Sequence, residues 1–166
     1  MGFLQQLWRR FIGSTGERDE GVSAVPADTA VRAEHSSNVN EEPLARFIPE
    51  RGHKSRISTQ KCEAKPSAFL PMWNDVRGRF ETSTFRIGGL DEGSVWRLAE
   101  QHVEPTQGRV IASAIVQGSG VFDAGLDIDP DDVPPRHACI IGWPEEKEAR
   151  KEHALLLREM SHLEMR

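Results

Sequence analysis

Residues 109–128 read RVIASAIVQGSGVFDAGLDI, and this stretch decides the predicted fold. The apolar run at 109–116 predicts one strand, while residues 121–128 alternate with the period of two that a half-buried strand requires. Between them, Gln117-Gly118-Ser119-Gly120 supplies glycines that tolerate the positive φ of a tight turn. The stretch therefore predicts a β-hairpin.

Shorter segments outside the hairpin complete a predicted sheet. Residues 45–48, 67–70 and 84–87 are bounded by proline, glycine or charge, as short strands usually are. Residues 137–141 (HACII) add another apolar strand after a pair of prolines. We therefore expect a small mixed or antiparallel sheet.

Two helices should pack on this sheet. Asp91 is suited to cap a helix that runs to about Val103. Pro144, followed by three glutamates, should open a second helix that ends near Leu163. The buried face expected for that helix comprises Ala149, Leu156, Met160 and Leu163. The predicted fold class is α+β, as one domain at 43–166.

The N-terminal residues have a different character. Six apolar residues in 1–13 recur at helical spacing and predict a short amphipathic helix, with Gly13 ending it: Phe3, Leu4, Leu7, Trp8, Phe11 and Ile12. Residues 14–42 are polar and acidic without periodicity, which predicts a disordered tether. An isolated helix of about ten residues is marginal in water, so its apolar face needs a surface. That surface is a partner protein, this domain or a second copy, or, less favoured, a membrane.

Composition bounds the class of protein. Of the 166 residues, 37% are hydrophobic and 28% charged, and the apolar run at 110–116 is much too short to span a membrane. Cys62 and Cys139 lack the spacing of a metal site or a disulfide framework, so reduced thiols and a cytoplasmic location are expected. The net charge of −5 conceals a basic block at 43–80, with eight basic and three acidic residues. Such a block either neutralises acidic neighbours or binds phosphate or an acidic partner.

Chemistry is only weakly marked in this sequence. No nucleotide fingerprint or usual metal-ligand spacing is present, so no cofactor and no metal are expected. Two histidines and a lysine could act as acid, base and charge stabiliser in phosphodiester cleavage: His53, Lys65 and His137. Nearby groups could bind the phosphate: Ser55, Arg56, Arg86 and Arg136. Without catalysis, the same residues would bind a nucleotide or phosphate group.

Two segments carry a resemblance. KPSAFLP at 65–71 and RHACIIGWP at 136–144 resemble recurring segments of a group of uncharacterised bacterial proteins, over roughly residues 44–160. The resemblance implies a bacterial, cytoplasmic, single-domain protein, and no activity attaches to it.

Two functional hypotheses follow. The favoured one is an accessory or adaptor protein that binds a protein partner, with the tethered helix as a docking element; we expect that partner to be encoded nearby. The alternative is a metal-independent phosphodiesterase or ribonuclease, or a sensor of a nucleotide or phosphate group, for which RNA or a nucleotide would be the ligand. Non-enzymatic binding is favoured because an apolar helix on a flexible acidic tether raises local concentration at a partner without fixing the geometry.

Overall fold

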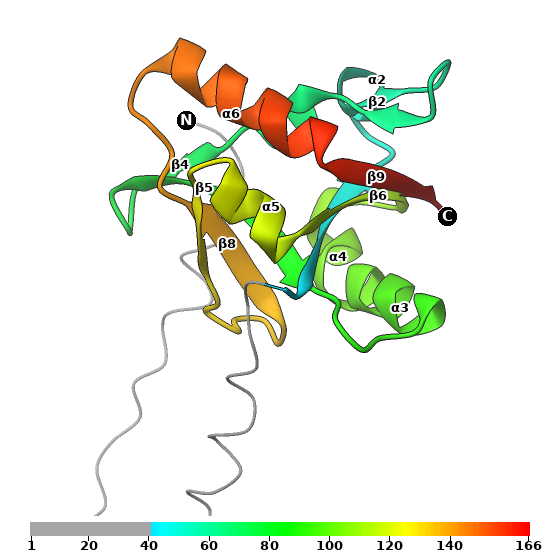
Figure 1. The fold of residues 1–166 in the computed structure, drawn as a ribbon. Helices are drawn as coiled ribbons and strands as arrows, with labels where there is room; N and C mark the ends of the chain where they lie inside the picture. The colour runs from blue at the N-terminus through cyan, green and yellow to red at the C-terminus, as the bar shows by residue number, and fades with distance from the viewer. Residues whose placement is uncertain (1–40) are drawn as a thin grey trace, which may run out of the picture. The chain divides into compact units, whose positions relative to one another are not determined.

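Seven strands form one sheet in the computed structural model, which describes residues 41–166 (Figure 1). The order is β7-β8-β5-β1-β6-β9, with β4 paired to β5 beside this path, and every pairing is antiparallel. The bounds are β1 Pro43–Pro49, β4 Met72–Asn74, β5 Arg79–Arg86, β6 Val110–Gln117, β7 Asp127–Asp129, β8 His137–Ile141 and β9 Ser161–Met165. A separate ribbon pairs β2, Ile57–Ser58, with β3, Glu63–Ala64. The α+β class is confirmed, with the antiparallel form of the sheet.

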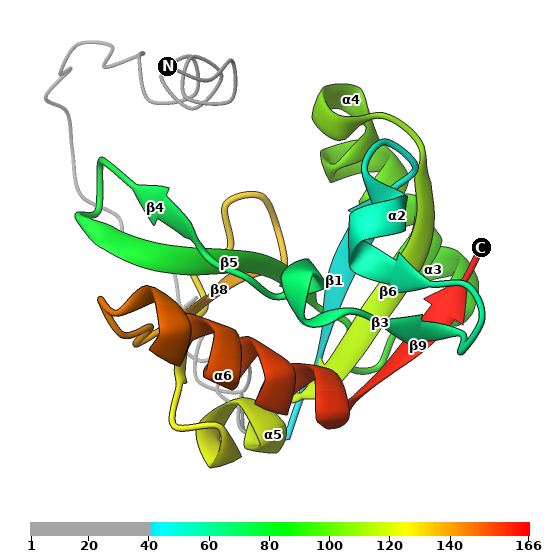
Figure 2. The ribbon, with the colours of Figure 1, turned by 90° about the horizontal axis from the view of Figure 1, so that it is seen from above.

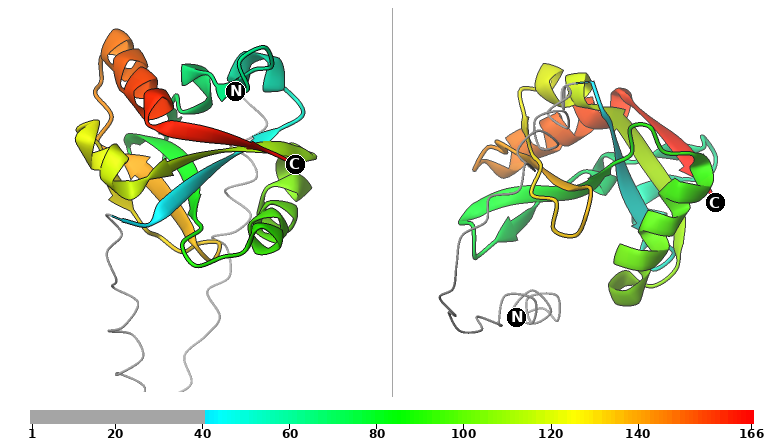
Figure 3. Two further views of the ribbon diagram at one scale, coloured as in Figure 1. Left: turned by 45° about the vertical axis from the view of Figure 1, so that its right-hand side comes forward. Right: turned by 90° about the horizontal axis from the view of Figure 1, so that it is seen from below.

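Two long helices pack on opposite faces of this sheet: α3, Glu92–His102, and α6, Lys147–Glu159 (Figures 2 and 3). The shorter helical segments are α2 His53–Arg56, η1 Pro66–Ala68, α4 Glu104–Gln107 and α5 Gly118–Asp123. Side chains alternate along β1, so that Leu44 and Ile48 enter the core under α6 while Ala45 and Phe47 enter the core under α3. The central strands are therefore buried on both faces, and the predicted pair of packed helices is confirmed.

Several local predictions are confirmed with adjusted bounds. The strands expected at 45–48, 84–87 and 109–116 lie in β1, β5 and β6, and the strand at 137–141 is β8. The carboxylate of Asp91 accepts a 2.7 Å hydrogen bond from the amide of Ser94 and so caps α3. These elements have strong local signals, namely apolar runs and a capping residue.

The predicted hairpin at 109–128 is wrong in its second half. Residues 118–123 form α5, a chain reversal follows at Gly125, and only 127–129 are extended, paired with β8 instead of β6. Val121 and Ala124 are three residues apart and buried in the same core, as residues on one face of a helical turn are, whereas in a strand they would point to opposite faces. Gly120 lets α5 lie close on β6, because a Cβ there would be 3.3 Å from Cγ2 of Val116. Close packing of α5 therefore overrode the alternating pattern.

The strand predicted at 67–70 is also wrong. Pro66 starts the 3₁₀ turn η1, where its fixed φ fits and its missing N–H is not needed. The amide of Phe69 donates to the carbonyl of Pro66 at 3.0 Å, and the Phe69 ring is fully buried beneath α6. The apolar residues of this segment thus anchor a turn.

The closing helix is shorter than predicted. It begins at Lys147 and ends at Glu159, after which the chain extends as β9 along the second edge of β6. Its buried residues are Ala154 and Leu157, whereas two residues of the predicted face, Leu156 and Met160, are 43% and 38% exposed. Pairing with β9 satisfies backbone groups of β6 that the helix prediction left unpaired.

The predictions for 1–13 and for most of 14–42 lie outside the described residues. The helices within 41–166 include none with the length and apolar character needed to cross a membrane. Cytoplasmic location remains a prediction.

Candidate functional site

His137 begins β8 and joins two side chains from separate parts of the fold. Its Nδ1 lies 2.6 Å from Oδ1 of Asp131, and its Nε2 lies 2.8 Å from Oγ of Ser83. Ser83 pairs directly with Cys139 across β5 and β8, so Ser83 and His137 are diagonal neighbours on one face of the sheet. His137 is only 3% exposed, whereas Ser83 is exposed. The result is a chain of serine, histidine and aspartate with the serine at its solvent end.

The loop before β8 places Asp131 against His137. Asp132 and Arg136 adopt positive φ of 52° and 66°, a conformation that L-residues seldom take. The loop is closed by hydrogen bonds from the amide of Asp132 to the carbonyl of His137 and from the amide of His137 to the carbonyl of Pro134. The carboxylate of Asp131 therefore faces a ring only six residues ahead of it in the chain.

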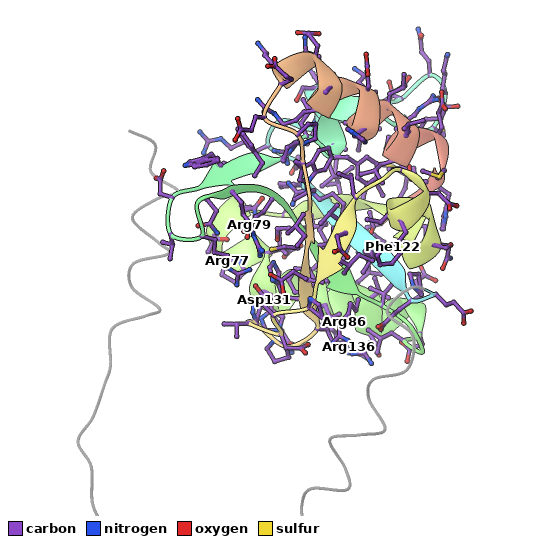
Figure 4. The ribbon with its side chains drawn as sticks, turned by 60° about the vertical axis from the view of Figure 1, so that its left-hand side comes forward. Arg77, Arg79, Arg86, Phe122, Asp131 and Arg136 are labelled. Atoms are coloured by element: carbon purple, nitrogen blue, oxygen red, sulfur yellow. The ribbon has the colours of Figure 1, made fainter. Side chains whose placement is uncertain are left out.

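Arginines of the β4–β5 hairpin surround this cluster. Arg77 donates to Asp131 at 2.7 Å, and Arg79 donates to Glu81 at 2.8 Å and also to Asp129. Figure 4 shows Arg77 and Arg79 gathered on the side of the sheet where Asp131 lies. The amide of the Asn74 side chain donates to Glu81 at 2.8 Å, which ties β4 to the same network. The hairpin and the β7–β8 loop are thus fixed to each other by alternating charges.

Electrostatics assign the protons of this network. Burial raises the pKa of Asp131, but hydrogen bonds and charge from His137, the Val133 amide and Arg77 outweigh it, so that the pKa lies below its ordinary value of 3.8. An ionised Asp131 can only accept, so Nδ1 of His137 donates to it; when the imidazole is neutral, its Nε2 is then the acceptor for the Ser83 hydroxyl. Burial and the charges of Glu81 and Asp131 raise the pKa of the Cys139 thiol to about 12, which keeps it protonated.

The same cluster contains donors of metal-ligand type. Asp131, His137 and Cys139 each offer an atom within 4.8 Å of the others. Two of these donors, however, bond each other, and the thiol of Cys139 lies 3.7 Å from Oε2 of Glu81 and donates to it. A cation would have to displace the proton between Asp131 and His137, so the network fits a proton chain better than a metal site.

The sequence-predicted residues near α2 form a local group of their own. His53 Nδ1 lies 2.6 Å from the carbonyl of Glu50, Ser55 donates to the carbonyl of Gly52, and Lys65 donates to the carbonyl of Lys54. Arg56 uses its carbonyl to accept from the amide of Lys65. These groups support the fold of the α2–η1 connection.

Arg86 and Arg136 lie with His137 instead. Arg86 pairs with Asp132 at 2.5 Å and with Glu42 at 3.6 Å, and Arg136 pairs with Glu42 at 3.6 Å (Figure 4). Nη1 of Arg136 also donates to the carbonyls of Arg86 and Gly88. Both guanidinium groups are therefore engaged by carboxylates or carbonyls, although the buried Nε of Arg86 has no hydrogen-bond partner among the described atoms.

The structure does not bring the two predicted histidines together. Figures 1 and 2 both place α2, which carries His53, apart from the start of β8, which carries His137. Acid–base cleavage of a phosphodiester needs both imidazoles within hydrogen-bond reach of one phosphate. The two-histidine mechanism is therefore not carried forward.

Sequence reasoning missed Ser83, Asp131 and Arg77. Ser83 lies within a strand, 54 residues from His137, and only the β5–β8 register makes them neighbours. The acidic residues at 127–132 have no local pattern that separates a solvated loop from one that is bonded to a histidine. A histidine placed six residues after an aspartate, with a pair of prolines between them, was the one available signal.

A second feature of this region is apolar. Leu70, Met72, Trp73 and Val76 are 37%, 58%, 51% and 70% exposed, and we call these four residues the β4 patch. The Trp73 ring contacts its cross-strand neighbour Phe80 edge-on at 5.0 Å, and Arg150 of α6 lies 3.8 Å above the Phe80 ring. The two strand residues of the patch, Met72 and Trp73, thus lie on a supported edge strand.

Two shallow surface pockets lie elsewhere, one beside Ile87 and Met165 and one beside Arg51 and Gln107, and neither includes Ser83 or the β4 patch. Comparisons with protein-family models, curated proteins and solved structures gave no match. The resemblance to bacterial proteins therefore stays a prediction, and functional proposals rest on the geometry alone.

The depressed pKa of Asp131 predicts an acid-dependent stability. A carboxylate with a lowered folded pKa stabilises the fold above its ordinary value of 3.8, and this contribution is lost as the pH falls through the folded value. Asp131→Asn should be less stable than wild type at pH 7, and the difference should shrink towards pH 3. Urea unfolding across this range measures it. Asp123→Asn, at an exposed position of α5, is the control, and an equal difference at both pH values would contradict the prediction.

Proposed function

We propose that this protein is an accessory or adaptor protein whose domain binds a partner protein at the β4 patch. The observation that carries the proposal is the exposure of four large apolar side chains within seven residues: two lie on β4, which has one neighbour among the described strands, and two lie in the segments that flank it. Scattered apolar residues are ordinary on a protein surface, but a group of them on one element usually marks an interaction site.

The rigidity of the hairpin supports this function. The carboxamide oxygen of Asn74 accepts from the amides of Val76 and Arg77, and the amide of Gly78 donates to the carbonyl of Asn74. Arg77 then anchors the turn to Asp131 and Glu81. A pre-organised surface loses little conformational entropy when it binds, which favours affinity.

The chemistry of the partner follows from the edge strand. Among the described strands, β4 pairs only with β5, so its other edge offers backbone groups to an extended chain. Neighbouring residues of a strand point to opposite faces of the sheet. Met72 and Trp73 would therefore each contact alternate side chains of the added strand on one face, and these contacts would confer specificity. We therefore propose an extended partner segment with apolar residues.

The predicted helix at 3–12 supplies the second docking element of the proposal. Two weak contacts joined by a flexible segment bind more tightly together than either does alone, because the second becomes intramolecular. Trp8 and Trp73 would then contribute to one complex from two separate sites.

Cross-linking in the native cells tests the partner site. A photoreactive residue at Val76, which is 70% exposed, should form a cross-link to another protein, whereas one at the exposed Glu152 of α6 should not. Mass spectrometry of the cross-link should identify an extended apolar segment. Trp73→Ser should weaken binding of that segment about thirtyfold or more, since buried tryptophan anchors contribute about 2 kcal/mol or more.

The thermal midpoint of Trp73→Ser is the accompanying control, and it should stay close to wild type because the side chain is half exposed. Trp8→Ser in the full chain should weaken the complex without changing the cross-linked segment. Cross-links that join only copies of this chain, or unchanged affinity in Trp73→Ser, would reject the proposed partner site.

A further inference from the structure

The hydrogen-bonded chain of Ser83, His137 and Asp131 is not used by the proposed partner binding. Its distances, 2.8 Å and 2.6 Å, are those that an activated nucleophile needs with its base, and the base with the group that orients it. The three residues come from β5, the start of β8 and the preceding loop. Such arrangements arise on unrelated folds and are recognised by geometry and not by the order of the residues in the chain.

The burial of each member matches its role. Asp131 and His137 have side chains 10% and 4% exposed, so bulk water does not compete strongly for the bond between them. Ser83 is exposed, and the imidazole of His137 is buried directly behind its hydroxyl. Phe85, two residues along β5, packs edge-on against the His137 ring with the centroids 5.4 Å apart, which limits rotation of the base.

The position of Ser83 on the sheet leaves room for a reactant. The core beneath α3 uses β1, β6 and the far end of β5, where Phe85 stacks on His102 of α3 at 6.0 Å. Ser83 lies beyond that border, on the part of the sheet face where the charged network lies. Because neither of the two pockets includes Ser83, we expect a reactant whose own reactivity suffices without a deep binding site, namely a small activated ester.

We propose that Ser83 is a catalytic nucleophile for small, activated acyl esters, with His137 as its general base and Asp131 as the positioning residue. The Ser83 Oγ attacks the carbonyl carbon of the ester while its proton passes to Nε2 of His137. The new Oγ–C bond replaces the bond from the carbonyl carbon to the ester oxygen, and His137 returns the proton to the departing alcohol. Water then attacks the acylated serine, passes a proton through His137 to Oγ, and releases the carboxylic acid.

Asp131 acts through His137 in this scheme. It accepts from Nδ1, and its second oxygen is held by Arg77 at 2.7 Å, so the ring keeps the orientation and tautomer that leave Nε2 free to accept a proton. The partner-binding proposal does not depend on these steps, because its patch contains none of the three residues.

Covalent labelling tests the nucleophile in the full chain. A fluorophosphonate should form an Oγ–P bond at Ser83 with loss of fluoride, and peptide mapping should place the added mass there. Labelling should be absent in Ser83→Ala, unchanged in Ser119→Ala, and slower by about a thousandfold in His137→Gln. p-Nitrophenyl acetate should acylate the same residue.

A thiol variant keeps the test valid if His137→Gln fails to fold. In Ser83→Cys, His137 should remove the thiol proton, so iodoacetamide should alkylate position 83 at least about tenfold faster than the exposed Cys62 of the same molecule. Ser119→Cys, at an exposed position of α5, should react no faster than Cys62. Labelling of another serine, no labelling of wild type, or equal rates at positions 83 and 62 would overturn the proposal, whichever way the cross-linking at Val76 turns out.

Discussion

Phe69→Ala is expected to lower the free energy of unfolding by about 3 to 5 kcal/mol, the range for removing a buried aromatic ring. Phe69 is fully buried in the core under α6, and its own carbonyl accepts a 2.7 Å hydrogen bond from the Thr82 hydroxyl of β5. The substitution would leave a cavity that η1 cannot fill, because Pro66 and the hydrogen bonds of the turn fix its backbone. Urea unfolding at neutral pH measures the loss.

The next residue in the chain is the matched control. Leu70 is 37% exposed, so Leu70→Ala should change stability by no more than about 0.5 kcal/mol. Similar losses for both variants would show that Leu70 is buried as deeply as Phe69.

Arg46→Ala is expected to lower the free energy of unfolding by about 1 to 3 kcal/mol, the cost of leaving two backbone acceptors, one of them partly buried, without a donor. Strands β1 and β5 pair only at Leu44 with Arg86 and at Ala45 with Phe85. Beyond them Arg46 bridges the gap, since Nε donates to the carbonyl of Ala68 at 3.2 Å and Nη1 donates to the carbonyl of Ser83 at 2.9 Å. The side chain thus replaces ladder hydrogen bonds between the two strands.

The charge of Arg46 limits the size of this effect. Burial, together with the positive charge of Arg56, lowers the pKa of Arg46 to about 10, so the guanidinium is charged at neutral pH but costly to bury. Arg46→Lys should recover only part of the stability, because a single ammonium cannot donate in the two directions that the guanidinium fork does. Arg97→Ala, whose side chain is 61% exposed, should cost no more than about 0.5 kcal/mol. A loss at Arg46 no larger than at Arg97 would contradict the bridging role.

Arg46 also connects the fold to the candidate nucleophile. It binds the backbone of Ser83 from one side of β5, while His137 binds the Ser83 side chain from β8. If Ser83 reacts as proposed, Arg46→Lys should reduce its rate of labelling more than its exposed counterpart Arg97→Lys does. That comparison separates loss of position from loss of the whole fold, because unfolding of each variant is measured independently.

The sequence pattern predicted an element correctly where one strong local signal was present. Asp91 caps α3 because a side-chain oxygen at that position satisfies a free helix amide whatever the rest of the fold does. The apolar run after the two prolines formed β8, since only an extended strand could bury both of its faces there. These two predictions depend only on residues that are close together in the sequence.

The sequence pattern gave a wrong prediction where the same local pattern was compatible with both a helix and a strand. Residues 121–128 alternate as a half-buried strand does, but packing against β6 and Trp143 buries Val121 and Ala124 in one core, which requires a helical turn. Leu163 was predicted to end the closing helix, but it lies in β9, because that segment pairs with the edge of β6. The choice in each case depended on residues far away in the sequence.

The sequence by itself determined the α+β class, the position of α3 and of strands β1, β6 and β8, and the presence of His137 at the start of a strand. Only the tertiary structure decided that Ser83 and Asp131 are the neighbours of His137, and that His53 is not. The physical reason is that hydrogen-bond register between β5 and β8 joins residues 54 positions apart, and periodicity along one segment carries no information about which strands pair.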